Sequence, residues 1–124
     1  MKTRSQALND LLEYNQSIDW ITTALKKFPW DSDTIYAVLT RTHIITVLQR
    51  YLDETLCEHQ VETWANAVEG RDDIAWEKGY EELLQETIHQ LANPLLTLSL
   101  TQNAAKKIMN VLLSDARMYS ASII

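Results

Sequence analysis

Glycine and proline, the residues that most readily form tight turns, occur only twice each among the 124 residues of this chain. A sheet whose strands are joined by tight turns needs more of them than Gly70, Gly79, Pro29 and Pro94 supply. A chain of this length is also expected to form one domain around a single core. We therefore expect residues 1–124 to form one all-α domain, a bundle of about five helices.

Apolar residues at spacings of three and four predict where these helices lie. The first stripe covers residues 5–28 with one gap at Asn15, and Pro29 ends it because proline disfavours helical geometry in the residue before it. Residues 31–39 contain β-branched and aromatic side chains and fit either an extended segment or a short helical turn. The four later helices are expected at residues 40–52, 58–69, 80–92 and 101–113.

Residues that begin or end helices stand at the expected boundaries. Thr40 and Thr101 can cap the second and fifth helices. Gly70 follows the third helix, where a left-handed residue is favoured, and Asn93 with Pro94 closes the fourth. The side chains expected on the buried faces of these four helices are Ile44, Ile45, Val47, Leu48, Tyr51, Leu52, Val61, Trp64, Ala65, Val68, Leu83, Leu84, Ile88, Leu91, Ala104, Ile108, Val111 and Leu112.

Acidic residues are concentrated in the middle of the chain. The net charge of −6 consists of −9 over residues 31–93 and +3 over the two ends together. Such a surface repels nucleic acid and anionic lipid and attracts basic proteins. The alternative interpretation is that acidity only keeps a small protein soluble.

The sequence indicates a cytoplasmic protein. The lone Cys57 has no second cysteine for a disulfide or a zinc site, which favours a reducing compartment. The basic Lys2 and Arg4 are not followed by the apolar segment of a signal peptide. No apolar run approaches the roughly 20 residues that span a bilayer.

Two arrangements with metal-ligand character are incomplete. Glu86 and His89 have the Glu-x-x-His spacing of a di-iron helix, but neither other histidine is preceded by a glutamate at that spacing. Asp72 and Asp73 could bind calcium or magnesium, but the residues after them do not supply oxygen ligands at the spacing of a calcium loop. We expect no metal and no cofactor.

The sequence also contains no complete catalytic motif. Cys57 with His59 or His43 contains a nucleophile and a base. Cys57, however, stands where the cap of the third helix is expected, so a structural role is favoured. Phosphate-binding glycine loops and the Gly-x-Ser-x-Gly motif do not occur. We expect a protein that is not an enzyme.

Two aromatic residues lie among charges. Trp76 follows Asp73 and precedes Glu77, and Tyr80 is close by. An aromatic residue ringed by carboxylates has the composition of a binding hot spot, in which the ring supplies energy and the charges steer the encounter. Packing of Trp76 over the core is an equal alternative.

Residues 39–101 resemble a group of small bacterial helical proteins. The resemblance rests on a capped helix, the sequence WANAVEGRDDI at residues 64–74, the sequence LANP at residues 91–94 and a further Leu-Thr cap. Cys57 departs from this pattern, since the group usually has serine or threonine there. Members look like immunity proteins of contact-dependent growth inhibition and related polymorphic toxin systems, which neutralise a toxin domain by direct binding.

The resemblance implies a basic partner, because many such toxins are nucleases that must hold phosphate. We expect this chain to cover the basic active-site surface of a cognate toxin. Arg71 with Asp72 and Asp73 is expected to form a structural ion-pair network, because a motif shared by a whole group is better explained by folding than by partner choice. The residues expected to contact the toxin are Glu58, Glu62, Glu69, Asp72, Asp73, Trp76, Glu77, Tyr80, Glu81 and Glu82.

Two other function classes remain open at this point. An adaptor or regulatory subunit that docks on a basic cellular protein would need the same acidic surface. A metal-dependent enzyme that uses Asp72, Asp73, Glu86 and His89 is the more distant alternative.

Overall fold

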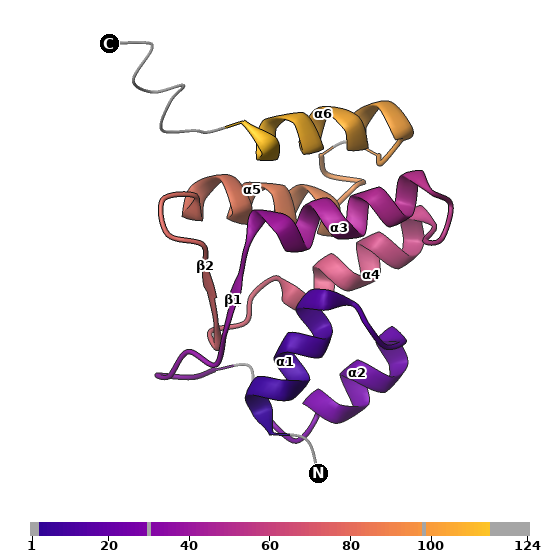
Figure 1. The fold of residues 1–124 in the computed structure, drawn as a ribbon. Coiled ribbons are helices and arrows are strands. Elements are labelled where there is room, and N and C mark those ends of the chain that lie inside the picture. Colours follow the sequence, from indigo (N-terminus) through magenta and orange to yellow (C-terminus); the bar gives the residue numbers. More distant parts are fainter. Residues whose placement is uncertain (1–2, 30, 98, 115–124) are drawn as a thin grey trace.

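The computed structural model describes residues 3–29, 31–97 and 99–114, and these are mainly helical (Figure 1). The described residues contain six helices, where about five were expected from the apolar spacing, and two short strands. The elements in chain order are α1 (Arg4–Glu13), α2 (Ile18–Leu25), β1 (Ala37–Leu39), α3 (Arg41–Leu52), α4 (Glu58–Val68), β2 (Ile74–Trp76), α5 (Glu81–Ala92) and α6 (Gln102–Leu113).

The single helix predicted over residues 5–28 is in fact two helices. Tyr14 ends α1 with a left-handed backbone, at a φ of 48°. This conformation costs a non-glycine residue about 1–2 kcal/mol, and burial of the Tyr14 ring in the core offsets that cost. Ser17 then begins α2, because its hydroxyl accepts the N–H of Trp20 at 3.2 Å. The gap in the apolar stripe at Asn15 marks this break.

Two strands join segments that are far apart in the sequence. β1 and β2 are parallel, in a register that places Leu39 opposite Trp76. The N–H of Tyr36 extends the pairing by donating to the carbonyl oxygen of Asp73 at 2.9 Å. Residues 37–39 are therefore extended, which decides between the two conformations considered for this segment.

The four later helices lie within one residue of their predicted bounds at each end. The hydroxyl of Thr101 accepts the N–H of Ala104 at 3.1 Å and so begins α6 as expected. Gly70 follows α4 with a φ of +84°, a conformation that glycine adopts without steric cost. The prediction that glycine ends this helix is confirmed.

Trp64 lies in the middle of the core. Its side chain is fully buried, and Nε1 donates to the carbonyl oxygen of Leu11 at 2.7 Å, which links α4 to α1. Most of the predicted core positions are buried or half-buried, but Val111 is 52% exposed and that prediction is wrong. Val111 lines an open groove between α5 and α6, whereas α6 packs chiefly on α3.

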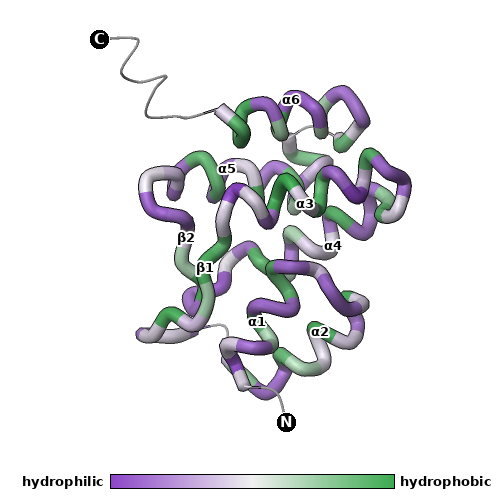
Figure 2. The backbone as a smooth tube through the Cα atoms, viewed as in Figure 1, coloured by the Kyte–Doolittle hydropathy of each residue, from purple (hydrophilic) through white to green (hydrophobic). Residues whose placement is uncertain are grey.

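The helices form tiers (Figure 1). α6 lies over α3 and α5 at one end, α1 and α2 lie at the other end, and α4 lies between them. Hydrophobic and hydrophilic segments alternate along α3 and α6 (Figure 2). Ile123 and Ile124, whose apolar side chains could let the C-terminal tail dock on the domain, lie outside the described residues. None of the described helices has the length and apolar character needed to cross a membrane.

Candidate protein-binding surface

The residues expected to contact a partner fall into two classes. Three of them, Asp73, Glu77 and Tyr80, interact with arginine side chains of the fold. Most of the others place carboxylates on the surface of α4, α5 and the turn before β2.

Asp73 is the centre of a buried ion-pair cluster. Arg71 donates from Nε to Oδ1 at 2.9 Å and from Nη2 to Oδ2 at 3.0 Å, and Arg4 donates from Nε to Oδ2 at 2.9 Å. Burial raises the pKa of Asp73, but the hydrogen bonds and charges of Arg71 and Arg4 outweigh burial and leave the pKa below its ordinary value. The predicted structural ion pair is confirmed for Arg71 and Asp73.

Arg4 extends this cluster to the chain before β1. Its Nη2 donates to the carbonyl oxygen of Pro29 at 2.7 Å, and its guanidinium lies 4.8 Å from the centre of the Tyr36 ring. The Asp73 cluster therefore joins α1, the segment before β1 and the turn after α4. Since the side chain of Asp73 is 0% exposed, it offers no surface to a partner. Asp72, next to it, is exposed.

Glu77 holds the end of β2 to the beginning of α3. Its Oε1 accepts the backbone N–H of Arg41 at 2.9 Å and Nε at 3.1 Å, while Oε2 accepts Nη2 at 3.1 Å. The guanidinium of Arg41 also lies 3.8 Å from the centre of the Tyr80 ring, which is itself buried. Glu77 and Tyr80 therefore have structural partners within the chain.

Trp76 lies on β2 rather than in a loop. It is half-buried and packs against the core. Of the two roles considered for this residue, packing over the core agrees with its position.

Three exposed or half-buried carboxylates, those of Glu69, Glu81 and Glu82, lie near the two ends of α5. Glu81 and Glu82 are in its first turn, where they suit the helix dipole, and Glu81 also accepts the N–H of Gly79 at 2.9 Å. Glu69 is at the opposite end, where it lies 2.7 Å from Nδ1 of His89 and accepts from Asn93 at 3.2 Å. The rise of an α-helix places Glu82 and Asn93 about 16 Å apart along α5.

Several of these carboxylates have no cationic partner in the part of the chain that the structure describes. Within residues 3–29, 31–97 and 99–114, no lysine, arginine or histidine forms an ion pair with Glu58, Glu62, Asp72, Glu81 or Glu82. Their negative charge is therefore directed to solvent and is available to a basic partner.

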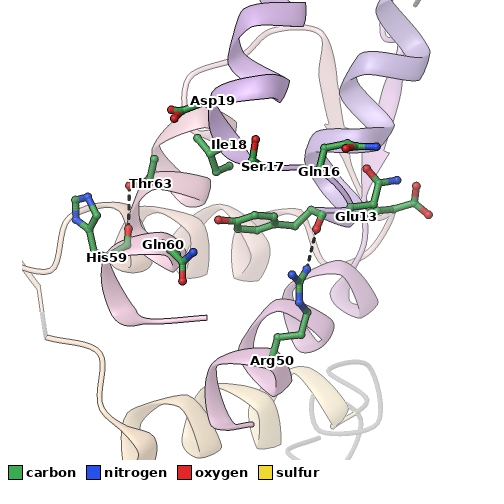
Figure 3. A pocket seen from close by; sticks show the side chains of 11 residues that line it. Glu13, Gln16, Ser17, Ile18, Asp19, Arg50, His59, Gln60 and Thr63 are labelled. Carbon is green, nitrogen blue, oxygen red and sulfur yellow. Dashed lines mark hydrogen bonds between the residues drawn. The ribbon is translucent and has the colours of Figure 1, made fainter. Parts of the chain in front are cut away.

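A groove of about 900 Å³ lies between the α1–α2 turn, α3 and α4 (Figure 3). Arg50 and His59 line it together with Glu13 and Asp19, so its lining carries charges of both signs. Arg50 is already engaged, because Nη1 donates to the carbonyl oxygen of Tyr14 at 2.8 Å and the guanidinium stacks 5.0 Å from the Tyr14 ring centre. No sequence pattern predicts this groove, since three separate segments of the chain form it.

The described residues contain no group of three or more histidine, cysteine or carboxylate side chains that could hold a metal ion. Glu86 lines a shallow groove between α5 and α6, whereas His89 pairs with Glu69. Cys57 is exposed at the start of α4, where its N–H donates to Oε1 of Gln60 at 2.8 Å.

No family model matches the sequence, and comparison with curated proteins and with solved structures found no match.

One exposed apolar feature was not predicted from the sequence. Leu95 and Leu96, in the connection between α5 and α6, are 97% and 79% exposed. Their position after Pro94, outside both helical stripes, was the available signal. Large apolar side chains at this exposure are typical of interaction sites when they are grouped.

Proposed function

We propose that this chain is an immunity protein that binds a cognate bacterial toxin domain and neutralises it by covering the toxin's basic active-site surface. The observation that carries the proposal is the set of carboxylates on α4, α5 and the intervening turn that have no cationic partner among the described residues. The resemblance of residues 39–101 to immunity proteins supplies the kind of partner.

The electrostatics suit a nuclease toxin. A nuclease needs a basic surface to hold phosphate, and an acidic protein is attracted to that same surface. Complementary charge accelerates association and rejects partners of like charge. Neutralisation then needs no chemistry in the inhibitor, because a bound inhibitor excludes the nucleic acid.

A complex of ordinary size would cover only a small part of this chain. A stable interface removes about 800 Å² from each partner, and this chain exposes 7550 Å². The carboxylates at the two ends of α5 supply the steering field, while the exposed leucines after Pro94 supply apolar contact. Asp73, Glu77 and Tyr80 support the fold beneath this surface.

Co-expression tests this function. The chain is expressed with the toxin domain encoded immediately upstream of its gene, and cell growth is measured. Rescue of growth, with a one-to-one complex on a sizing column, is expected. The variant Glu58→Gln/Glu62→Gln/Glu81→Gln/Glu82→Gln should rescue less well, whereas Lys106→Gln/Lys107→Gln, which neutralises exposed lysines of α6, should rescue fully. Toxicity that persists in the presence of the folded wild-type chain contradicts the proposal.

An adaptor that docks on a basic cellular protein is the alternative, and the same unpaired carboxylates favour it. Gene order separates the two, because an adaptor gene has no toxin gene beside it. Capture of one basic cellular protein by the wild-type chain, and loss of that capture in the four-glutamine variant, would support the adaptor.

A further inference from the structure

A pocket of about 240 Å³ lies where the start of α4, the end of α5 and the connection to α6 meet. Glu58 and Glu62 of α4 line one side. Leu91, Pro94 and Leu100 supply apolar surface on the others. The pocket therefore combines two carboxylates with an apolar lining.

The two carboxylates belong to one helix face and repel each other. Glu58 and Glu62 are four residues apart on α4, a spacing that brings side chains together, and like charges at this spacing destabilise a helix. Neither forms an ion pair with a described residue of the chain. Glu58 is in the first turn, where the helix dipole favours it, but Glu62 is in the middle of α4 and has no such benefit.

The negative field of this site acts on a neighbouring residue. The hydroxyl of Tyr51 donates to the carbonyl oxygen of Leu100, a pocket residue, at 3.5 Å. Burial raises the pKa of Tyr51, and the charge of Glu58 raises it further. A cation placed between Glu58 and Glu62 would oppose their mutual repulsion and the effect of the Glu58 charge on Tyr51.

Exposed apolar surface borders the pocket. Leu95 lines it and is 97% exposed, and the neighbouring Leu96 is 79% exposed. A partner that covers two adjacent exposed leucines removes apolar surface from water, which favours binding. The partner that fits this arrangement carries a cation beside apolar side chains.

We infer that this pocket binds one arginine side chain of the partner, next to apolar residues of the same segment that pack on Leu95 and Leu96. The aliphatic part of the arginine lies against Leu91 and Leu100, and its guanidinium reaches the carboxylates of Glu58 and Glu62. Arginine fits better than lysine, because its planar fork matches carboxylate geometry. The inference rests on the proposed function for the identity of the partner, since it names the anchor by which the toxin would be held.

A peptide tests the pocket without any toxin. Acetyl-Leu-Arg-Leu-amide is titrated into the ¹⁵N-labelled chain, and amide shifts are followed by NMR. Saturable shifts are expected at the pocket residues Glu62, Gln90, Leu91 and Leu100. The counterpart with citrulline in place of arginine should bind at least about fivefold more weakly, because it cannot form charge-assisted hydrogen bonds. Shifts scattered over α5, or equal binding of the two peptides, overturn the inference.

Matched variants test the same pocket by calorimetry with the toxin domain encoded beside the gene. Glu58→Gln/Glu62→Gln and Leu95→Ser should each weaken binding by about tenfold or more, whereas Glu81→Gln/Glu82→Gln, at the far end of α5, should weaken it less. Leu95 is almost fully exposed, so its replacement leaves the fold intact even if the glutamate variant is less stable.

The two experiments separate the pocket from the proposed function. Toxin binding that is unchanged in the pocket variants overturns the pocket and leaves the immunity function standing. If the wild-type chain binds the arginine peptide but no toxin, the immunity function fails and the pocket is supported as the site of another arginine-bearing protein.

Discussion

Arg71 and Asp73 form an ion pair in which both side chains are inside the fold, 3% and 0% exposed, with Nε 2.9 Å from Oδ1. Arg4 approaches the same carboxylate from α1, at 2.9 Å from Oδ2. Arg71 and Asp73 of the RDD sequence therefore stabilise the fold. The acidic surface available to a partner lies elsewhere.

Replacement of Asp73 by asparagine should strongly destabilise the chain. The change keeps the shape of the side chain but leaves two arginines without their buried counter-charge, which typically costs about 3–5 kcal/mol. The measurement is the free energy of unfolding in urea. The control is Asp72→Asn at the exposed neighbouring position, which should stay within about 0.5 kcal/mol of wild type. Equal stability of the two variants would contradict the assignment.

The same carboxylate should make stability depend on acid pH. The pKa of Asp73 is lower in the folded chain than in the unfolded chain. Its contribution to the free energy of unfolding is therefore complete above the ordinary carboxyl pKa of about 3.9. That contribution is lost as the pH falls from there through the lower pKa of the folded chain. The difference in unfolding free energy between wild type and Asp73→Asn should therefore narrow as the pH is lowered from 6 to 3. A difference in unfolding free energy that stays constant between pH 6 and pH 3 would contradict the ion-pair cluster around Asp73.

His43 should give a second dependence on pH, in a higher range. Its Nδ1 accepts the N–H of Thr40 at 3.0 Å, which requires that nitrogen to be unprotonated. Burial lowers the pKa of His43, and the charge of Glu13 offsets this only in part. The neutral His43 ring therefore makes its full contribution to the free energy of unfolding above the ordinary histidine pKa of about 6.5. This contribution is lost as the pH falls below that value.

The matched variant for this prediction is His43→Gln, since glutamine supplies an acceptor at the same capping position and does not titrate. The midpoint of thermal unfolding is compared between pH 7.5 and pH 5.5. Wild type should lose more stability than the variant on acidification. A parallel change in the two proteins would show that another group controls this range.

Glu77 should behave as a structural residue and Glu82 as a surface residue. Glu77→Gln removes the charge from the acceptor of the three hydrogen bonds that Arg41 donates. A hydrogen bond to a charged group typically contributes about 1.5–3 kcal/mol to stability. We expect a loss near the lower end of that range, about 1–2 kcal/mol, because both side chains are roughly a quarter exposed and water screens the pair. Glu82→Gln should change stability little. Unfolding in urea distinguishes them, and an unchanged stability of Glu77→Gln is the contrary result.

Local signals were enough to predict α3 to α6. Each has apolar residues at helical spacing and a recognisable boundary, such as Thr101 before α6 or Gly70 after α4. The break after α1 was harder, because it depends on the left-handed conformation of Tyr14, a residue that rarely takes it. Its ring and the guanidinium of Arg50 stabilise that turn, and Arg50 is far away in the sequence.

The remaining features depend on long-range contacts. β1 and β2 have three residues each, too few to show a strand period in the sequence, and they form by pairing with each other. The role of Asp73 depends on Arg4, 69 positions earlier, and the role of Glu77 on Arg41, 36 positions earlier. The acidic residues predicted from the sequence to contact a partner therefore include both buried and exposed carboxylates.

The most direct test of the account is the affinity of the purified chain for the toxin domain encoded beside its gene, measured by calorimetry at low and high salt. We predict a one-to-one complex whose affinity falls as salt is raised, because the carboxylates of α4 and α5 that have no cationic partner among the described residues would face a basic surface. A folded chain that forms no complex with that toxin domain, even at low salt, would contradict it.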